Sequence, residues 1–150
     1  MTKTVLVTGA SSGIGQAQAL TFLENGYRVY GVDKSENPGF LNELRFFKMD
    51  LTDDLTPLFT SLPEVDILCN TAGILDDYCP LHEISDEDWE QIFALNLTAT
   101  MKITRFYLQK MLEKKSGIII NMCSIASFLA GGGGAAYTAS KHALAGLTKQ

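Results

Sequence analysis

The chain has 150 residues, 46% of them hydrophobic and 19% charged, and a formal net charge of -5 at pH 7. This composition is typical of one globular domain and excludes a disordered, highly charged chain. The acidic balance also argues against electrostatic attraction to nucleic acid or to a membrane surface, because both depend on clustered lysine and arginine side chains.

Apolar runs of strand length alternate with longer segments of helical periodicity. The predicted strands are residues 4–7, 28–32, 45–49, 67–70 and 117–122, and the predicted helices are residues 15–25, 54–62, 86–115 and a last one from about 136. This alternation is typical of βαβ units around a parallel sheet. The strands are continuous apolar runs, as strands covered on both faces should be. We therefore predict an α/β fold, a Rossmann-type doubly wound parallel sheet with helices on both faces.

Local signals mark the ends of several helices. Gly26 is expected to close the first helix, because glycine commonly follows the last helical residue. The long helix opens with Ser85 and three acidic residues and closes with two lysines, which suits the helix dipole. Two connections, residues 72–84 and 124–136, are long, and long loops in compact domains are usually functional.

The first candidate site is the stretch TGASSGIG, residues 8–15, which links the first strand to the first helix. Glycines let the backbone amides approach a pyrophosphate, and the helix N-terminus adds partial positive charge. The spacing GxxxGxG differs from the usual GxGxxG, and such a turn can also be a plain connection. The candidate cofactor-binding residues here are Gly9, Ser11, Ser12, Gly13, Ile14 and Gly15.

Asp33 ends the second strand, about 20 residues after these glycines, where a carboxylate can accept hydrogen bonds from the adenosine ribose. A 2′-phosphate beside it would meet repulsion of up to roughly 4 kcal/mol per charge pair at an effective dielectric of about 20. NAD is therefore favoured over NADP, although Lys34 could offset part of the repulsion and NADP stays possible. The alternative interpretation of Asp33 is a solvated acid at a strand end.

The second candidate site is YTASK, residues 137–141, with Ser124 upstream and a run of four glycines, residues 131–134, between them. In a helix, Tyr137 and Lys141 project from the same face one turn apart. A free phenol has a pKa of about 10, and a nearby ammonium stabilises the phenolate and lowers that pKa towards neutrality. Ser124 can then bind a substrate oxygen, with the glycines leaving room for a ligand. A YxxxK match alone is weak, because such pairs are more often exposed packing contacts.

Taken in order, these motifs resemble the classical short-chain dehydrogenase/reductase family over the whole length of the chain. TGASSGIG matches its cofactor turn, and Asp33 matches the acid of its NAD-preferring members. Asp50 and Leu51 match the position beside the adenine. The segment NTAG, with Asn70, Ala72 and Gly73, stands where the family has NNAG. The catalytic positions of the family fall on Asn96, Ser124, Tyr137 and Lys141. The resemblance also implies that Tyr137 and Lys141 are cofactor-binding, with Lys141 on the nicotinamide ribose, and that Asn96 holds a water of the proton relay.

Three departures from the family pattern qualify the resemblance. Thr71 replaces the second asparagine of NNAG, which puts local rigidity in doubt, although its hydroxyl can replace some of the lost bonds. Cys123 replaces the first serine of a common pair and is expected to be structural. Family members also run on well beyond this length. We expect residues 1–150 to be one NAD(P)-binding Rossmann domain, the N-terminal portion of a longer one, so the C-terminal part of the family fold is absent.

The resemblance implies hydride transfer between a nicotinamide cofactor and a carbonyl or secondary alcohol. The motif wording is most similar to the 3-oxoacyl-acyl-carrier-protein reductase branch, whose substrate is an acyl thioester and whose usual cofactor is NADPH. The alternatives are an NAD-dependent sugar, polyol or hydroxy-acid dehydrogenase and a non-catalytic dinucleotide-binding regulator. A homodimer or homotetramer is also implied.

Other residues carry weaker signals. No apolar run is long enough to cross a bilayer, and no cleavage site follows Met1, so we expect a cytoplasmic protein without a membrane partner. Three cysteines without CxxC spacing argue against a disulfide scaffold and a zinc site. The acidic pairs at residues 53–54 and 76–77 are expected to be solvated, and no metal site is predicted.

Overall fold

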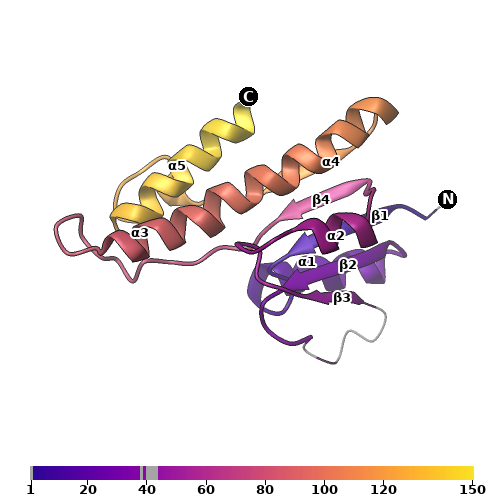
Figure 1. Ribbon diagram of the computed structural model, residues 1–150, viewed down its shortest axis with the longest axis horizontal. Coiled ribbons are helices and arrows are strands. Elements are labelled where there is room, and N and C mark those ends of the chain that lie inside the picture. The colour runs from indigo at the N-terminus through magenta and orange to yellow at the C-terminus, as the bar shows by residue number, and fades with distance from the viewer. Residues whose placement is uncertain (1, 38, 40–43) are drawn as a thin grey trace. The chain divides into compact units, whose positions relative to one another are not determined.

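The computed structural model describes residues 2–37, 39 and 44–150. Its elements are β1 (Thr4–Thr8), α1 (Gly13–Glu24), β2 (Arg28–Asp33), β3 (Arg45–Lys48), α2 (Thr56–Ser61), β4 (Ile67–Asn70), α3 (Asp86–Phe93), η1 (Ala94–Ala99), α4 (Thr100–Lys114), β5 (Ile118–Asn121), η2 (Ile125–Ser127) and α5 (Ala135–Lys149) (Figure 1). The chain divides into two compact units. The first is Met1–Ala72 with Ile103–Ile120, and the second is Gly73–Lys102 with Asn121–Gln150.

The first unit carries a sheet of order β3-β2-β1-β4-β5. Strand β1 lies parallel to both β2 and β4, so that Val5 pairs with Val29 on one side and with Ile67 on the other. After β3 the chain returns past β1 to form β4, and the strand order reverses at this point. Open α/β sheets bind their ligands at such a switch point, beyond the carboxyl ends of the strands. The predicted parallel, doubly wound fold is confirmed.

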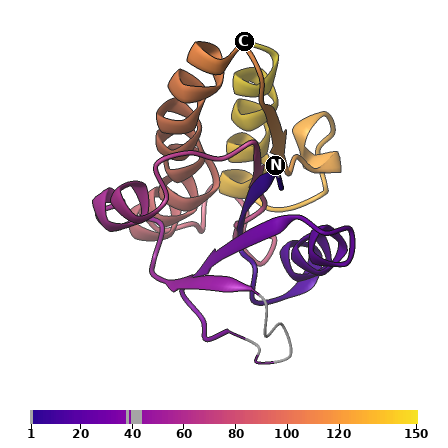
Figure 2. The same cartoon turned by 90° about the vertical axis from the view of Figure 1, so that its right-hand side faces the viewer.

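Both faces of β1 are covered. Val5, Leu6 and Val7 are fully buried although successive side chains of a strand point to opposite faces. Val5 and Val7 belong to a core cluster that includes Ala19 of α1. Figure 2 shows α1 on one side of the sheet and α2 on the other. The continuous apolar pattern of β1 therefore follows from helices on both faces.

On the α2 side, aromatic rings fill the core. The rings of Phe59 and Phe106 stack with their centroids 4.0 Å apart, and the Tyr107 hydroxyl donates to the carbonyl oxygen of Leu62 at 2.8 Å. Burial raises the pKa of the Tyr107 phenol, so the hydroxyl stays neutral and keeps this bond. These contacts fix the end of α2 against α4.

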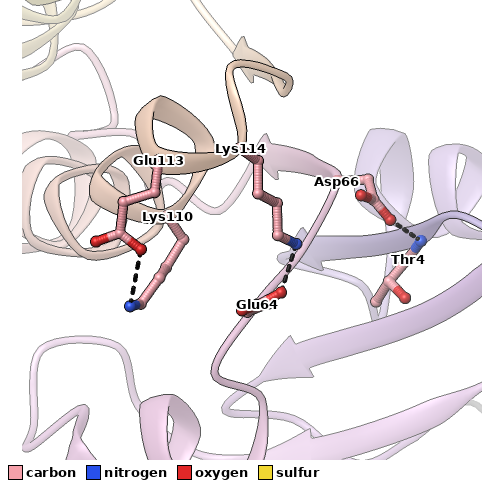
Figure 3. Close-up of polar contacts among 6 residues, drawn as sticks. All are labelled: Thr4, Glu64, Asp66, Lys110, Glu113 and Lys114. Carbon is pink, nitrogen blue, oxygen red and sulfur yellow. Dashed lines mark hydrogen bonds and ion pairs between the residues drawn. The ribbon is translucent and has the colours of Figure 1, made fainter.

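Polar contacts hold the amino ends of β1 and β4 together (Figure 3). The carboxylate of Asp66 accepts a hydrogen bond from the Thr4 amide at 2.8 Å. Lys114, the last residue of α4, pairs with Glu64, and the hydrogen bond that its ammonium donates to that carboxylate raises the pKa of Lys114. These contacts tie the start of β4 to the start of β1 and to the end of α4.

Three expectations differ from the structure. The strands are displaced by at most one residue at either end, while β4 matches its prediction. The predicted helix at 86–115 has nearly the right extent, but its middle, η1, is a π-helix. Strand β5, at the edge of the described sheet, differs from the expectation of two covered faces, since Ile118 is 49% exposed.

The second unit is built around α5, which packs against α3, η1 and η2. Its helix α3 begins at Ser85, whose hydroxyl accepts a hydrogen bond from the Asp88 amide, as the sequence signal predicted. Among the described residues, no helix combines the length and apolarity needed to span a membrane. In the same part of the chain, no group of three or more potential ligand side chains is arranged around a common metal position.

Candidate active site

The glycine turn of the first unit depends on one left-handed residue and on one close approach of the backbone. Gly9 has a φ of 71°, in the left-handed region that favours glycine. A Cβ on Gly15 would lie 2.1 Å from the carbonyl oxygen of Gly9, so only glycine lets α1 start this close to the turn. The helix begins at Gly13, two residues earlier than predicted, and its exposed N-cap, Ser12, makes no side-chain cap bond.

The first turn of a helix carries amides without intrahelical partners, which bind anions well. Ile14, in this turn of α1, is 58% exposed. The Ser11 hydroxyl oxygen is buried and has no hydrogen-bond partner within the described residues. An unpartnered hydroxyl beside a helix N-terminus fits a phosphate-bearing cofactor, because a phosphate oxygen would accept from both groups.

The Thr8 hydroxyl joins the glycine turn to the end of β4. Its oxygen accepts from the amides of Thr71 and Ala72 at 2.9 and 3.0 Å, and the hydroxyl donates to the carbonyl oxygen of Cys69. Thr8 is 2% exposed, so water does not replace these bonds. This residue fixes the two strand ends that flank the switch point, a role that the sequence analysis did not assign.

Replacing Thr8 by valine keeps the shape of the side chain but leaves two part-buried amides without an acceptor. We expect the free energy of unfolding to fall by about 1–3 kcal/mol, measured by urea denaturation. Thr8→Ser is the matched control, because it keeps the hydroxyl, and should retain most of the stability. Equal losses in both variants would assign the effect to the methyl group instead.

Asp33 lies beside the glycine turn, as predicted. Its carboxylate accepts from the amide of Ser11 at 3.1 Å and from the amide of Ser35 at 3.0 Å. The Gly9 amide also donates to the carbonyl oxygen of Val32 at 2.9 Å. The acid is therefore held in place against the turn, which argues against a freely solvated strand end.

The other candidate adenine-side residues lie after β3. Asp50 accepts hydrogen bonds from the amide and the hydroxyl of Thr52, and these bonds lower the pKa of its carboxyl group. Leu51 is buried. Their predicted role beside an adenine stays a prediction.

The NTAG segment closes β4 with a set of side-chain bonds. The Asn70 amide group donates to the Thr104 hydroxyl at 2.9 Å, and the Thr71 hydroxyl donates to the Gln18 side chain at 2.5 Å. The Ala72 α-carbon would lie 2.9 Å from a Cβ on Gly9. Thr71 thus supplies a bracing bond of its own, as the sequence analysis allowed for a hydroxyl at this position.

All four predicted catalytic residues, Asn96, Ser124, Tyr137 and Lys141, belong to the second unit. Tyr137 and Lys141 lie one turn apart on α5, and the Lys141 ammonium nitrogen is 5.7 Å from the centre of the Tyr137 ring. Lys141 is only 4% exposed, and its ammonium donates to the carbonyl oxygen of Met122 at 2.8 Å. The pair is therefore not an exposed packing contact.

Burial lowers the pKa of Lys141, and the neighbouring Cys123 opposes this by raising it. A cation inside a protein is costly unless it is well partnered. The Met122 carbonyl occupies one of the three donors of the ammonium, which leaves two for other groups.

Asn96 lies in the π-helix η1 and is fully buried. Its side chain exchanges two hydrogen bonds with the backbone of Ile74, both at 2.9 Å, and donates to the Ser140 hydroxyl at 3.2 Å. Ser140 in turn donates to the carbonyl oxygen of Tyr137 at 2.8 Å. A Cβ on Gly73 would lie 3.2 Å from the Asn96 oxygen and 3.5 Å from the Lys141 nitrogen, so these groups meet around Gly73.

Ser124 forms the N-cap of the short helix η2, which packs against α5. Its hydroxyl oxygen accepts from the Ala126 amide at 3.1 Å, while its own amide donates to the Ser127 hydroxyl at 3.0 Å. The Ser124 hydroxyl accepts in this cap and keeps its own proton for another partner. The residue can therefore donate to a substrate oxygen without leaving its structural position.

The glycines before α5 pack closely against their neighbours. A Cβ on Gly133 would lie 2.4 Å from the ring of Tyr137, and a Cβ on Gly134 would lie 2.4 Å from the backbone of Cys79. An open hollow of about 440 Å³ does lie beside them. It is lined by Tyr78, Cys79, Pro80, Ala130, Gly131, Gly133, Gly134, Ala135, Thr138 and Ala139.

The expectation that both acids at 76–77 are solvated is wrong for Asp76. Its side chain is 8% exposed, and its two oxygens accept from the amides of Gly134 and Tyr137 at 2.7 and 2.9 Å. The carboxylate is buried because the start of α5 supplies donors for it. No local sequence signal could have shown this, since the partners are about 60 positions apart, whereas Asp77 is exposed as predicted.

The family of the chain follows from comparison with known proteins. A family model described as short chain dehydrogenase matches residues 3–150. The chain belongs to the short chain dehydrogenase family. The roles predicted for the glycine turn and for Ser124, Tyr137 and Lys141 stay predictions.

Individual members of the short chain dehydrogenase family are similar over almost the whole chain. The short-chain dehydrogenase/reductase olcF of Penicillium canescens is 40% identical over 97% of this chain, which spans 60% of that protein. The 3beta-hydroxysteroid dehydrogenase 2 of Eggerthella lenta is 35% identical over 98% of this chain, which spans 63% of that protein. The solved structure of 4-hydroxyisoleucine dehydrogenase complexed with NADH has a TM-score of 0.90 and 37% identity, covering 99% of this chain and 67% of that one.

Proposed function

We propose that the protein is an NAD(P)-dependent oxidoreductase that transfers a hydride between a nicotinamide cofactor and a carbonyl or secondary alcohol. One observation carries the proposal: a buried ammonium, Lys141, lies within 5.7 Å of the Tyr137 ring centre on the same helix face. A dinucleotide-binding regulator would have no use for this costly arrangement. The glycine turn with Asp33 supplies the second requirement, a place for the cofactor.

In this proposal each residue has a defined task during reduction. Tyr137 gives its proton to the substrate oxygen as negative charge develops there, and Ser124 donates a hydrogen bond to the same oxygen. Lys141 stabilises the phenolate that remains. Asn96 bonds to the backbone of Ile74, in the loop after β4, and to Ser140 of α5. It therefore holds this loop against the helix that carries Tyr137 and Lys141.

We further propose that NAD is preferred to NADP. The carboxylate of Asp33 is fixed beside the turn by the amides of Ser11 and Ser35, so it cannot swing away from a 2′-phosphate without losing both bonds. Solved structures of relatives are named with NADH and with NADP, so the proposal rests on Asp33.

The experiment is a spectrophotometric assay of the full-length protein with NADH and with NADPH. We expect the ratio of kcat/KM for NADH to that for NADPH to exceed one. Asp33→Asn should lower this ratio by at least about tenfold, because the charge repulsion is removed. Asp53→Asn, at an exposed acid, is the matched control and should leave the ratio unchanged. Equal ratios in the wild type and Asp33→Asn would contradict the assigned role of Asp33.

The substrate is proposed at the level of a class. The relatives act on compounds named as a hydroxysteroid and a hydroxyisoleucine, so a panel should contain a hydroxysteroid, a hydroxy-amino acid, a polyol and an acetoacetyl thioester. Turnover of the thioester alone would support a 3-oxoacyl-acyl-carrier-protein reductase. Tight NADH binding without any turnover would support a regulator instead. A cytoplasmic location and a homodimer or homotetramer stay predictions.

A further inference from the structure

The loop after β4 contains a tight turn at residues 76–79 with an unusual backbone. The Cys79 amide donates to the Asp76 carbonyl oxygen at 2.8 Å, and the two residues between them, Asp77 and Tyr78, have φ angles of 48° and 61°. Two successive left-handed residues make a turn that normally carries glycine, asparagine or aspartate, so Tyr78 is the unusual residue here. Such conformations persist only where the surroundings hold them, and they cluster at functional sites.

This turn supplies the acceptors for the first amides of α5. The Asp76 carboxylate accepts from the amides of Gly134 and Tyr137, and the carbonyl oxygen of Cys79 accepts from the amide of Ala135 at 2.9 Å. The N-cap of α5 is Gly134, which has no side chain to perform this function. The cap of α5 is therefore provided by a segment about 60 residues earlier in the chain.

The turn is also seated directly against the helix start. A Cβ on Gly134 would lie 2.5 Å from the amide nitrogen of Cys79 and 2.6 Å from a carboxylate oxygen of Asp76. No side chain can separate the two segments, so their spacing is set by backbone contact. Since Asp76 is 8% exposed, its bonds to α5 do not compete freely with water.

The residue held by this cap is Tyr137 itself. Its amide is bound by Asp76, and its carbonyl oxygen is bound by the Ser140 hydroxyl. We propose that Asp76 is a positioning residue, which sets the location of the Tyr137 phenol by fixing the backbone of Tyr137. This inference rests on the proposed function, because it assigns Asp76 a task in the same reaction.

The test compares two adjacent aspartates with the same chemical change, in the full-length protein. Asp76→Asn retains one acceptor oxygen and replaces the other by a donor that cannot accept from an amide. Asp77→Asn removes a neighbouring exposed charge and keeps a residue that tolerates a positive φ. Each kcat is expressed per NADH-binding site, so that a smaller folded fraction does not count as slower chemistry.

We expect Asp76→Asn to lower kcat by about 10- to 100-fold, since a misplacement of about 1 Å can cost about 100-fold. The NADH dissociation constant should stay within about twofold, and Asp77→Asn should match the wild type. The primary deuterium isotope effect on kcat with 4-deuterated NADH should be at least as large as in the wild type, because the chemical step becomes slower. An unchanged kcat per NADH site in Asp76→Asn would overturn the proposal.

Hydrogen exchange separates this proposal from the proposed function. Amides of residues 134–141 should exchange faster in Asp76→Asn than in the wild type and in Asp77→Asn, whether or not the protein turns over any substrate. Faster exchange in Asp76→Asn, together with a wild type that turns over no substrate, would support the Asp76 anchor and count against the oxidoreductase assignment. Unchanged exchange at these residues would overturn the Asp76 proposal, even in an active enzyme.

Discussion

Tyr137→Phe is expected to lower kcat by about 100- to 10,000-fold while leaving NADH affinity nearly unchanged. The substitution removes one oxygen atom, the proposed proton donor. The backbone of Tyr137 keeps its bonds to Asp76 and Ser140, because neither involves the phenol. Steady-state kinetics and NADH fluorescence titration measure the two quantities separately.

Tyr107→Phe is the matched control, because it makes the same chemical change at a buried tyrosine in the first unit. Its hydroxyl donates to the Leu62 carbonyl oxygen, so we expect a loss of about 1 kcal/mol in the free energy of unfolding and no change in kcat. If Tyr137→Phe and Tyr107→Phe were equally active, the phenol of Tyr137 would have no part in the chemistry.

Gly15→Ala is expected to disrupt the glycine turn. The new Cβ would lie 2.1 Å from the carbonyl oxygen of Gly9 and 3.1 Å from that of Thr8, and both are backbone atoms. The helix must therefore move away from the turn. Overpacking of this kind costs about 1–3 kcal/mol, which corresponds to roughly 5- to 150-fold in NADH affinity if the cofactor-bound geometry carries the strain.

Gly26→Ala, at the other end of α1, separates this effect from a general loss of helix stability. Gly26 has a φ of 77° but no neighbouring atom within 4 Å of an added Cβ. This variant should lose about 1–2 kcal/mol of stability from backbone strain and bind NADH normally. Normal NADH affinity in Gly15→Ala would show that the turn tolerates the shift and would remove the argument for Gly15.

The sequence was sufficient to predict the sheet and its parallel order, because buried strands and amphipathic helices have distinct periodicities. It did not predict the exposed face of β5, since an apolar run does not show which segments will cover the strand. It also missed the π-helix η1. No proline or glycine marks that segment, and the buried Asn96 makes its bonds to Ile74 and Ser140 through tertiary contacts.

The candidate site was predictable where the residues that form it lie close together in the sequence. The Tyr137 and Lys141 spacing depends only on helix geometry, and Gly15 depends on the turn beside it. Asp76 was expected to be exposed to solvent, because the only signal near it in the sequence is a second aspartate. Its partners Gly134 and Tyr137 lie far along the chain, so their contact depends on the folded loop rather than on any pattern near residue 76.

The distant cap of α5 also has a consequence for the order of folding. The first turn of this helix receives its protein acceptors only after residues 76–79 have closed a loop of about 60 residues, which carries an entropy cost that local caps avoid. Refolding should therefore restore helical content before it restores the environment of Tyr137. A chain that has collapsed without completing this closure would contain α5 but not the fixed backbone position of Tyr137.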